Sequence, residues 1–216
     1  SWSPNQKKVA LTNTTRTGVE LWLLDVESAT VEKLTEATLN ANIGGVITWN
    51  TDSQSMFVKM ISKKRKPLID TNTVVPEGPT VSTNFGAKAQ NRTYQDLLKN
   101  SSDEHNFEQL ATSVIYKISI NGDSEKWLDD AMYKSISLSP DGNYVMVSQI
   151  KKPFSYLVTY SRFPSQTDVY NIEGELVTNL LDTPLIEELP KGRMSTRMGK
   201  RSYSWRADAP ATLVYV

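Results

Sequence analysis

The chain has 216 residues, of which 24 are Lys or Arg, 24 are Asp or Glu and one is His, so its formal net charge is zero. This balance gives no general field that would attract nucleic acid or an anionic membrane. Hydrophobic residues make up 38% of the chain, which is typical of a folded domain. No apolar run approaches the roughly 18–20 residues that a membrane helix needs. The chain has no cysteine, so it cannot form a disulfide.

The first predicted elements belong to a phrase that the chain repeats. "SPNQKKVAL", Ser3–Leu11, returns as "SPDGNYVMV", Ser139–Val147, and weaker echoes stand at Asn50–Val58 and Arg206–Val216. A short run with β propensity precedes each copy. Repetition of this kind predicts an architecture built from similar units.

The repeated phrase predicts two strands joined by a tight turn. Pro140 suits the second position of a type I turn and Gly142 the fourth. One strand is therefore expected to end at Leu138, and the next to begin near Asn143.

After the first copy, Gly18–Val26 is predicted to be a strand and Thr30–Thr35 a short return strand. The first repeat would then hold four short antiparallel strands. Trp2 and Trp49 stand 47 positions apart at the starts of the first two repeats, which is close to the period of a four-stranded propeller blade.

The second repeat is interrupted. The segment 63–91 is polar and broken by prolines, which predicts a long extended excursion. Two helices are predicted after it, at Thr93–Leu98 and at Ser101–Ala111, the second with Ser101 and Glu104 in a capping-box pattern. Strands resume with a hairpin that turns at Asn121–Asp123.

The sequence therefore predicts an all-β fold, a partial β-propeller of four-stranded antiparallel blades with a short helical insertion. The blade-like ranges are 1–45, 46–62 with 112–130, 133–182 and 202–216, and the insertion is 63–111. The chain begins and ends inside repeats, so we expect a fragment of a longer propeller. Its incomplete blades would leave apolar faces for self-association. The residues expected on those faces are Val9, Leu11, Leu21 and Leu23 at one end and Leu213, Val214 and Tyr215 at the other. The tryptophans, such as Trp2, Trp49 and Trp127, are expected to pack between blades.

The repeats resemble those of the prolyl oligopeptidase family of serine peptidases. Three segments that a propeller does not need for folding, Arg92–Ser113, Lys151–Pro164 and Ser202–Val216, resemble the N-terminal propeller of its glutamyl endopeptidase branch, with bacterial dipeptidyl aminopeptidases and acylaminoacyl peptidases as further relatives. Two residues depart from that pattern: Thr159 stands where Pro is usual, and Lys152 where Arg is usual.

The resemblance implies a parent serine peptidase whose C-terminal α/β-hydrolase domain is absent from this chain. No G-x-S-x-G nucleophile motif occurs in the sequence. The single histidine, His105, lies in a polar helical stretch and is better explained as a solvated helix residue than as a catalytic base. We therefore expect no catalytic residue, no metal site and no cofactor in this chain.

The resemblance implies a propeller that gates or positions peptide substrates for the absent hydrolase domain, in a periplasmic or secreted protein. The alternative is a stand-alone propeller that binds a protein partner. Arg162 and Tyr160, in an insertion between strands, are the candidate substrate-binding residues, because an arginine there could pair with a carboxylate. Arg162 could equally clamp its own loop to the blade. The basic run 62–66 is interpreted as a solvated loop, so nucleic acid is not an expected partner.

Overall fold

The computed structural model describes residues 1–70, 73, 78, 94–188 and 197–216. Within them strands predominate, with one α-helix, α1 (Ser101–Ala111), and a 3-10 helix, η1 (Tyr160–Arg162). The strands are β1 (Lys8–Thr14), β2 (Val19–Asp25), β3 (Thr30–Lys33), β4 (Ile47–Trp49), β5 (Ser55–Ile61), β6 (Ser113–Ser119), β7 (Ser124–Leu138), β8 (Tyr144–Ile150), β9 (Ser165–Asn171), β10 (Leu176–Thr183), β11 (Ser204–Trp205) and β12 (Leu213–Val214).

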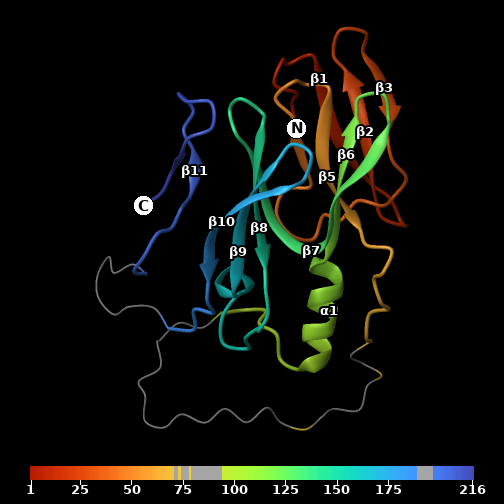
Figure 1. Cartoon of the computed structure of the whole chain (residues 1–216). Helices are drawn as coiled ribbons and strands as arrows, with labels where there is room; N and C mark the ends of the chain where they lie inside the picture. Colours follow the sequence, from red (N-terminus) through yellow and green to blue (C-terminus); the bar gives the residue numbers. More distant parts are fainter. Residues whose placement is uncertain (71–72, 74–77, 79–93, 189–196) are drawn as a thin grey trace.

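All strand pairs are antiparallel, and within each sheet every paired strand is next to its partner in sequence. One sheet has the order β1-β2-β3, a second runs from β10 to β4 in unbroken reverse order, and β11 pairs with β12. The long strand β7 is shared, because Ser124–Ala131 pairs with β6 while Met132–Leu138 pairs with β8. The large sheet therefore consists of two four-stranded blades that share β7. In Figure 1, β8, β9 and β10 form one group and β5 and β6 lie to their right.

The predicted all-β fold, a partial propeller with four-stranded antiparallel blades, is confirmed. β7 crosses the boundary between the ranges 112–130 and 133–182, so the second and third repeats share one strand. A bulge-like register shift between Tyr133 and Ser135 lies close to the point where the strand passes from one blade to the next. The division of the chain into repeats stays a prediction.

The repeated phrase forms the same turn three times. In each turn the amide of the fourth residue donates to the carbonyl of the first, and the fourth residue has a positive φ: Gln6 (59°), Ser53 (60°) and Gly142 (76°). The three hydrogen bonds are Gln6 N to Ser3 O (2.9 Å), Ser53 N to Asn50 O (3.1 Å) and Gly142 N to Ser139 O (2.9 Å). Only one of the three positions holds the glycine that this conformation favours.

Neighbouring turns also touch, and this connects the blades. The amide of Asn5 donates to Ser53 Oγ at 3.1 Å, and the amide of Asp141 donates to the carbonyl of Pro210 at 3.1 Å. Gly142 lies so close to Thr51 that a Cβ at position 142 would be 2.1 Å from Thr51 Oγ1. Successive turns therefore form a continuous row along one face.

Two tryptophan side chains form matching hydrogen bonds from the first strand of one blade to the preceding blade. Trp49 Nε1 donates to the carbonyl of Ser1 at 3.1 Å, and Trp205 Nε1 donates to the carbonyl of Ser137 at 3.0 Å. In both cases a tryptophan that closes an inner strand reaches the preceding blade. This shared relation supports the assignment of β11 and β12 to the next blade.

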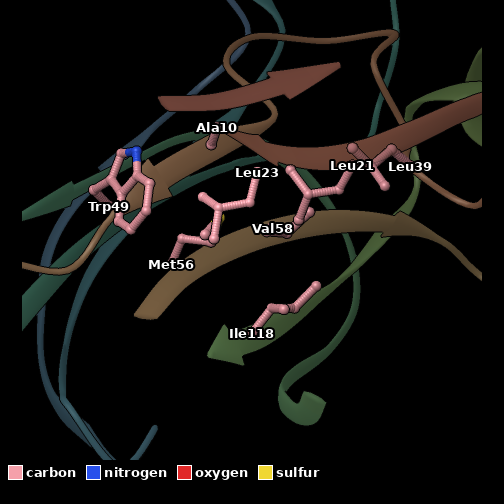
Figure 2. Packing of buried hydrophobic residues seen from close by; sticks show 8 residues of the cluster. All are labelled: Ala10, Leu21, Leu23, Leu39, Trp49, Met56, Val58 and Ile118. Atoms are coloured by element: carbon pink, nitrogen blue, oxygen red, sulfur yellow. The ribbon is translucent and has the colours of Figure 1, made fainter. Parts of the chain in front are cut away.

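Two apolar cores fill the spaces between successive blades. The first, shown in Figure 2, packs the β1–β3 sheet on β4–β6. Its buried members are Ala10, Leu21, Leu23, Leu39, Trp49, Met56, Val58 and Ile118. The second packs Phe57 and Trp127 together, with ring centroids 4.5 Å apart, against the next blade.

The expected exposed apolar face at the N-terminal end is partly wrong. Leu21 and Leu23 are buried in the first core, because their side chains point toward β5, whereas Leu11 is 39% exposed. Trp2 is 60% exposed, so the expectation that it packs between blades is also wrong. Val214, Tyr215 and Val216 are exposed at the other end, and self-association there stays a prediction that light scattering can test.

The helical insertion differs in part from its prediction. Helix α1 is confirmed at Ser101–Ala111, but its N-cap is Asn100, whose side chain accepts a bond from Asp103 N. The capping box on Ser101 is therefore wrong by one residue. Residues 94–98 are not helical, so the predicted helix Thr93–Leu98 is wrong over its described part. Thr93 and most of the predicted excursion 63–91 lie outside the described residues.

Candidate functional site

The blades present two different faces. The repeated turns and the outer hairpin turns lie on one face, which we call the turn face. Helix α1, the connection 151–164 after β8, and the segments 38–46, 184–188 and 197–203 lie at the opposite ends of the strands, on what we call the insertion face (Figure 1). Because loops carried on a rigid scaffold commonly hold functional residues, we look for a site on the insertion face.

Helix α1 is fixed to the blades by its C-terminal end. The buried side-chain amide of Asn40 donates to the carbonyls of Leu110 and Thr112, at 2.9 and 2.8 Å. The exposed Asn42 also donates to Leu110 O, at 3.0 Å. These bonds satisfy carbonyl groups that the end of a helix leaves without intrahelical partners.

The connection 151–164 packs on α1 through aromatic side chains. Phe107 of the helix meets Phe154 and Phe163 edge to face, with centroid separations of 5.1 and 5.6 Å. Lys152 Nζ lies 2.9 Å from Glu108 Oε2. The two insertions that the sequence singled out therefore form one apolar cluster on the insertion face.

The two predicted site residues both lie in η1 but have different surroundings. The Arg162 guanidinium lies over the ring of Tyr94, 5.1 Å from its centroid, and its buried Nη1 has no hydrogen-bond partner among the described residues. The Arg162 carbonyl accepts a bond from Ile186 N at 3.0 Å. Tyr160 is 45% exposed and lines a pocket that Arg162 does not line.

This pocket has a volume of about 590 Å³ and lies over one side of the blade formed by β7 to β10. Each of the four strands supplies two lining residues: Lys134 and Ser135 from β7, Met146 and Ser148 from β8, Ser165 and Thr167 from β9, Leu181 and Thr183 from β10. Ile43, Gly44, Tyr160 and Ser161 contribute to its wall, together with Ile186 and four residues of 197–203.

The charge of the pocket lining is entirely positive. Lys134, Arg197 and Arg201 line the pocket, and no Asp or Glu is among its lining residues. The salt bridges found in the described part of the chain involve none of these three cations. We call this site the cationic pocket.

The segment that carries Arg201 is held by backbone and aromatic contacts. Arg201 and Val216 exchange two backbone hydrogen bonds, each 2.8 Å long. The rings of Tyr203 and Tyr215 are 5.3 Å apart. Ser202, between Arg201 and Tyr203, has φ of 55°, a conformation that is uncommon for a residue with a side chain.

A further cation lies behind the wall of the cationic pocket. Lys59 of β5 is 2% exposed, and its Nζ donates to the carbonyls of Ile43 and Tyr133. Burial lowers the pKa of Lys59 from about 10.5 to about 8, because the charged form loses hydration. Gly44 lines the pocket, and a Cβ at Gly44 would be 3.7 Å from Lys59 Nζ, so the ammonium lies close to the pocket wall.

His105 has a structural contact. Its Nε2 lies 3.0 Å from the carbonyl of Pro67, so the ring links α1 to the segment before it. Among the residues that the structure describes, no group of three or more His, Cys, Asp or Glu side chains is placed to hold a metal ion. No helix in this part of the chain combines the length and the apolar character that crossing a membrane requires.

Tyr160, which the sequence singled out, lines the pocket, and its role in substrate binding stays a prediction; sequence reasoning did not single out Lys134, Arg197 or Arg201. These cations stand in no motif, and two of them are more than sixty positions from the third. They line the same pocket because the segment 197–203 returns to the blade of β7. Nothing in the sequence alone indicates that the segment 197–203 lies beside the blade of β7.

The chain has extensive similarity to named proteins. It is 36% identical over 202 residues to a probable glutamyl endopeptidase, chloroplastic, from Oryza sativa, covering 92% of this chain. It is 34% identical over 227 aligned residues to the protein of the same name from Arabidopsis thaliana, covering 99% of this chain. The chain is homologous to the glutamyl endopeptidases. The resemblance seen in the sequence is thereby confirmed.

The alignment covers a limited part of the glutamyl endopeptidase relatives. The chain spans 21% of the Oryza protein and 23% of the Arabidopsis protein. No protein-family model matches the chain. Among solved structures, an acylaminoacyl peptidase from Pyrococcus horikoshii is 16% identical, with a TM-score of 0.47 over 84% of this chain and 24% of that one. The fold assignment therefore rests on the strand order and turn contacts described above.

Proposed function

We propose that this chain is the non-catalytic propeller region of a serine peptidase and that it gates and positions peptide substrates for a hydrolase domain elsewhere in the whole protein. One observation carries the proposal: 92–99% of the chain aligns with glutamyl endopeptidases at 34–36% identity, yet it spans only about a fifth of their length. The remaining four fifths of such a protein has ample length for a catalytic domain.

The two faces differ in a way that supports this proposal, because one suits a rigid support and the other suits substrate contact. The turn face joins the blades by repeated short-range contacts, which favours a rigid support. The insertion face carries an exposed tyrosine, a cationic pocket and a helix with its own apolar cluster. We propose that the insertion face lies toward the hydrolase domain and the substrate.

The gating proposal is tested by substrate size. In the full-length protein, a glutamyl peptide of a few residues should be cleaved efficiently, and the same sequence placed in a loop of a stably folded protein should resist cleavage. Unfolding that host protein should restore cleavage. Equal rates on the folded and unfolded hosts would contradict a gating role.

Arg162 and Tyr160 are the substrate contacts that we propose on this face. The unpartnered Nη1 of Arg162 supports a role in donating hydrogen bonds to a substrate carboxylate. A guanidinium N–H that is buried without an acceptor lowers the stability of the folded state, and a carboxylate oxygen would supply that acceptor. Its stacking on Tyr94 supports the alternative, in which it clamps the loop.

Arg162→Ala in the full-length protein separates these two roles. A substrate contact predicts that kcat/KM for acidic substrates falls by about 1.5–3 kcal/mol of transition-state binding, with less effect on neutral ones. A clamp predicts equal loss on both substrates together with a lower Tm. Tyr94→Phe, which keeps the ring under the guanidinium, is the control for a general loss of packing.

The alternative function is a stand-alone propeller that binds a protein partner. The gene downstream of Val216 decides between the two. A G-x-S-x-G motif followed by Asp and then His supports the peptidase, whereas a stop codon soon after the last blade supports the binding module. A periplasmic or secreted location remains part of the proposal and is tested by cell fractionation; the two plant relatives are named chloroplastic.

A further inference from the structure

We propose that the free side of the first blade is a docking surface for one further propeller blade, which the full-length protein carries outside residues 1–216. The first blade is β1 to β3 together with the stretch 1–3, where Trp2 pairs with Val9 in an isolated bridge. We call β4 to β7 the second blade and β7 to β10 the third. The proposal goes beyond the proposed function and does not depend on it, because a peptidase propeller and a stand-alone binding propeller would both use this contact.

One row of side chains recurs at the same place in all three blades. It begins at the end of the innermost strand, continues at the residue seven positions later, and reaches the third strand. Side chains of directly paired residues lie on the same side of a sheet, so each row belongs to one side of its blade. The three rows are Trp2, Val9 and Leu24; Trp49, Met56 and Ile118; and Leu138, Val145 and Tyr170.

In the second and third blades this row is covered by the preceding blade. Met56 and Ile118 are 0% exposed and Trp49 is 7% exposed, and all three pack on the first blade (Figure 2). Val145 is likewise 0% exposed, in the core between the second and third blades, and the other two members of its row pack on that core. The row is therefore the surface through which a blade contacts the blade before it.

The first blade presents the same row on its free side. Ala10 and Leu23 are buried against the second blade. Val9 and Leu24 alternate with them along β1 and β2, so they point to the opposite side, where they are only half-buried. Trp2, which begins the row, is 60% exposed. A continuous row of accessible apolar side chains marks a contact surface.

Trp2 also carries the polar group that joins the blades elsewhere. Trp49 and Trp205 donate their indole N–H to the carbonyls of Ser1 and Ser137. Each acceptor directly precedes the first residue of the row in its own blade. Because Trp2 stands at the same place in its blade as Trp49, we expect its Nε1 to donate to the corresponding carbonyl of the docked blade.

These contacts favour a blade as the occupant over an isolated helix or loop. The occupant must offer an apolar side, as Leu21 and Leu23 do for the second blade, and a backbone carbonyl at a fixed place on its inner strand. A further repeat of this architecture meets both requirements. Residues 1–216 span 21–23% of the glutamyl endopeptidase relatives, so a whole protein of that length has ample room for further blades.

Thiol labelling of the full-length protein tests the docking. Residues 1–216 contain no cysteine, so Leu11→Cys adds one reporter beside the row, and Val31→Cys is its matched control. Leu11 is 39% exposed, but its counterparts Val58 and Val147 in the second and third blades are 0% and 1% exposed. Val31 is 53% exposed, and its counterpart Leu176 in the third blade is 60% exposed. Docking should therefore cover position 11 and leave position 31 open.

The two variants are treated with a maleimide, and mass spectrometry of the peptide around each position gives the labelling rate. In the native protein, Leu11→Cys should react about tenfold more slowly than Val31→Cys, because a covered thiol reacts only after local opening. In denaturant the two should react equally. Equal rates in the native protein would overturn the proposal. Protection that disappears when an oligomer dissociates on dilution, as followed by light scattering, would also overturn it, since the occupant would then be a second copy.

Substitution of the indole gives an independent readout. Trp2→Phe in the full-length protein keeps an aromatic ring but removes the N–H donor, so it should lower the Tm by an amount comparable to that in Trp49→Phe, whose bond to Ser1 is already formed. A lowered Tm in Trp49→Phe with an unchanged Tm in Trp2→Phe would count against the docked blade. Neither measurement requires peptidase activity, so the docking proposal can fail while the proposed function stands.

Discussion

The turn face repeats one turn geometry from blade to blade, whereas the insertion face carries connections that differ from blade to blade. On the turn face, three turns at positions 3–6, 50–53 and 139–142 share one hydrogen bond and one positive φ. On the insertion face, the connections after β1, β5 and β8 differ widely in length. The turn face repeats because it must join blades of one geometry, and the insertion face is free to vary because the strands are already fixed.

This difference indicates where substitutions act on stability and where they act on binding. The turn face is tightly packed between neighbours, so changes there should propagate to the blades. Changes on the insertion face should act on α1 or on the cationic pocket and leave the blades folded. The predictions below test this contrast, from the largest expected effect to the smallest.

The largest effect is expected at Gly142. Gly142→Ala places a Cβ 2.1 Å from Thr51 Oγ1 at a residue with φ of 76°, so the variant should lose about 3 kcal/mol of unfolding free energy through clash and backbone strain. Chemical denaturation measures the loss. Gly122→Ala is the control, because its φ is 90° but nothing lies within 4 Å of the added Cβ.

The same position allows a rescue. Thr51→Ala removes the Oγ1 that the new Cβ meets, and so should recover part of the loss in Gly142→Ala. The strain from the positive φ, about 1 kcal/mol, should remain. If Gly142→Ala costs no more than Gly122→Ala, the close contact between the second and third turns is not present in solution.

The next effect is local to the insertion face. Asn40→Ala leaves the carbonyls of Leu110 and Thr112 without their buried donor, which should cost about 2 kcal/mol. Hydrogen exchange should rise first in α1 and only slightly in β5 and β6. The control is the exposed Asn42→Ala, which should cost about 0.5 kcal/mol because water can replace its amide. Equal losses of unfolding free energy in the two variants would show that the burial of Asn40 does not increase its contribution to stability.

Lys59 gives a pH-dependent prediction. Its pKa of about 8 in the folded state lies below the ordinary value of 10.5, so between these values the unfolded chain binds more protons and stability rises with pH. From pH 8 to pH 9.5, the unfolding free energy should increase by about 1.5 kcal/mol relative to Lys59→Met. The two proteins are compared by denaturation at each pH. Parallel curves would mean that Lys59 keeps an ordinary pKa when folded.

The smallest effect tests the equivalence of the turns. Gln6 has φ of 59° in the position that glycine occupies at Gly142. Gln6→Gly should therefore stabilise the protein by about 0.5 kcal/mol, because relief of the left-handed strain exceeds the added freedom of the unfolded chain. A small rise in Tm is the expected readout, and a fall would mean that the first turn differs from the third in solution.

The repeated phrase was sufficient to predict the blades because its information is local. A Ser-Pro-Asp-Gly turn between two β-prone runs fixes where one strand ends and the next begins, and the structure has the ends at Leu138 and Tyr144. Helix α1 was predictable from the spacing of its apolar residues for the same reason. The resemblance to the glutamyl endopeptidases likewise lay in contiguous segments of sequence.

The sequence by itself determined the strands, most of the turns and α1, since each depends on residues a few positions apart. Tertiary structure alone decided which cations line one pocket, because Lys134 and Arg201 share that lining only through the return of 197–203 to the blade of β7. It also decided that Lys59 is buried and that Leu21 faces β5. Such features depend on how the blades pack. Packing brings together residues that are far apart in the sequence, and no local sequence pattern predicts those contacts.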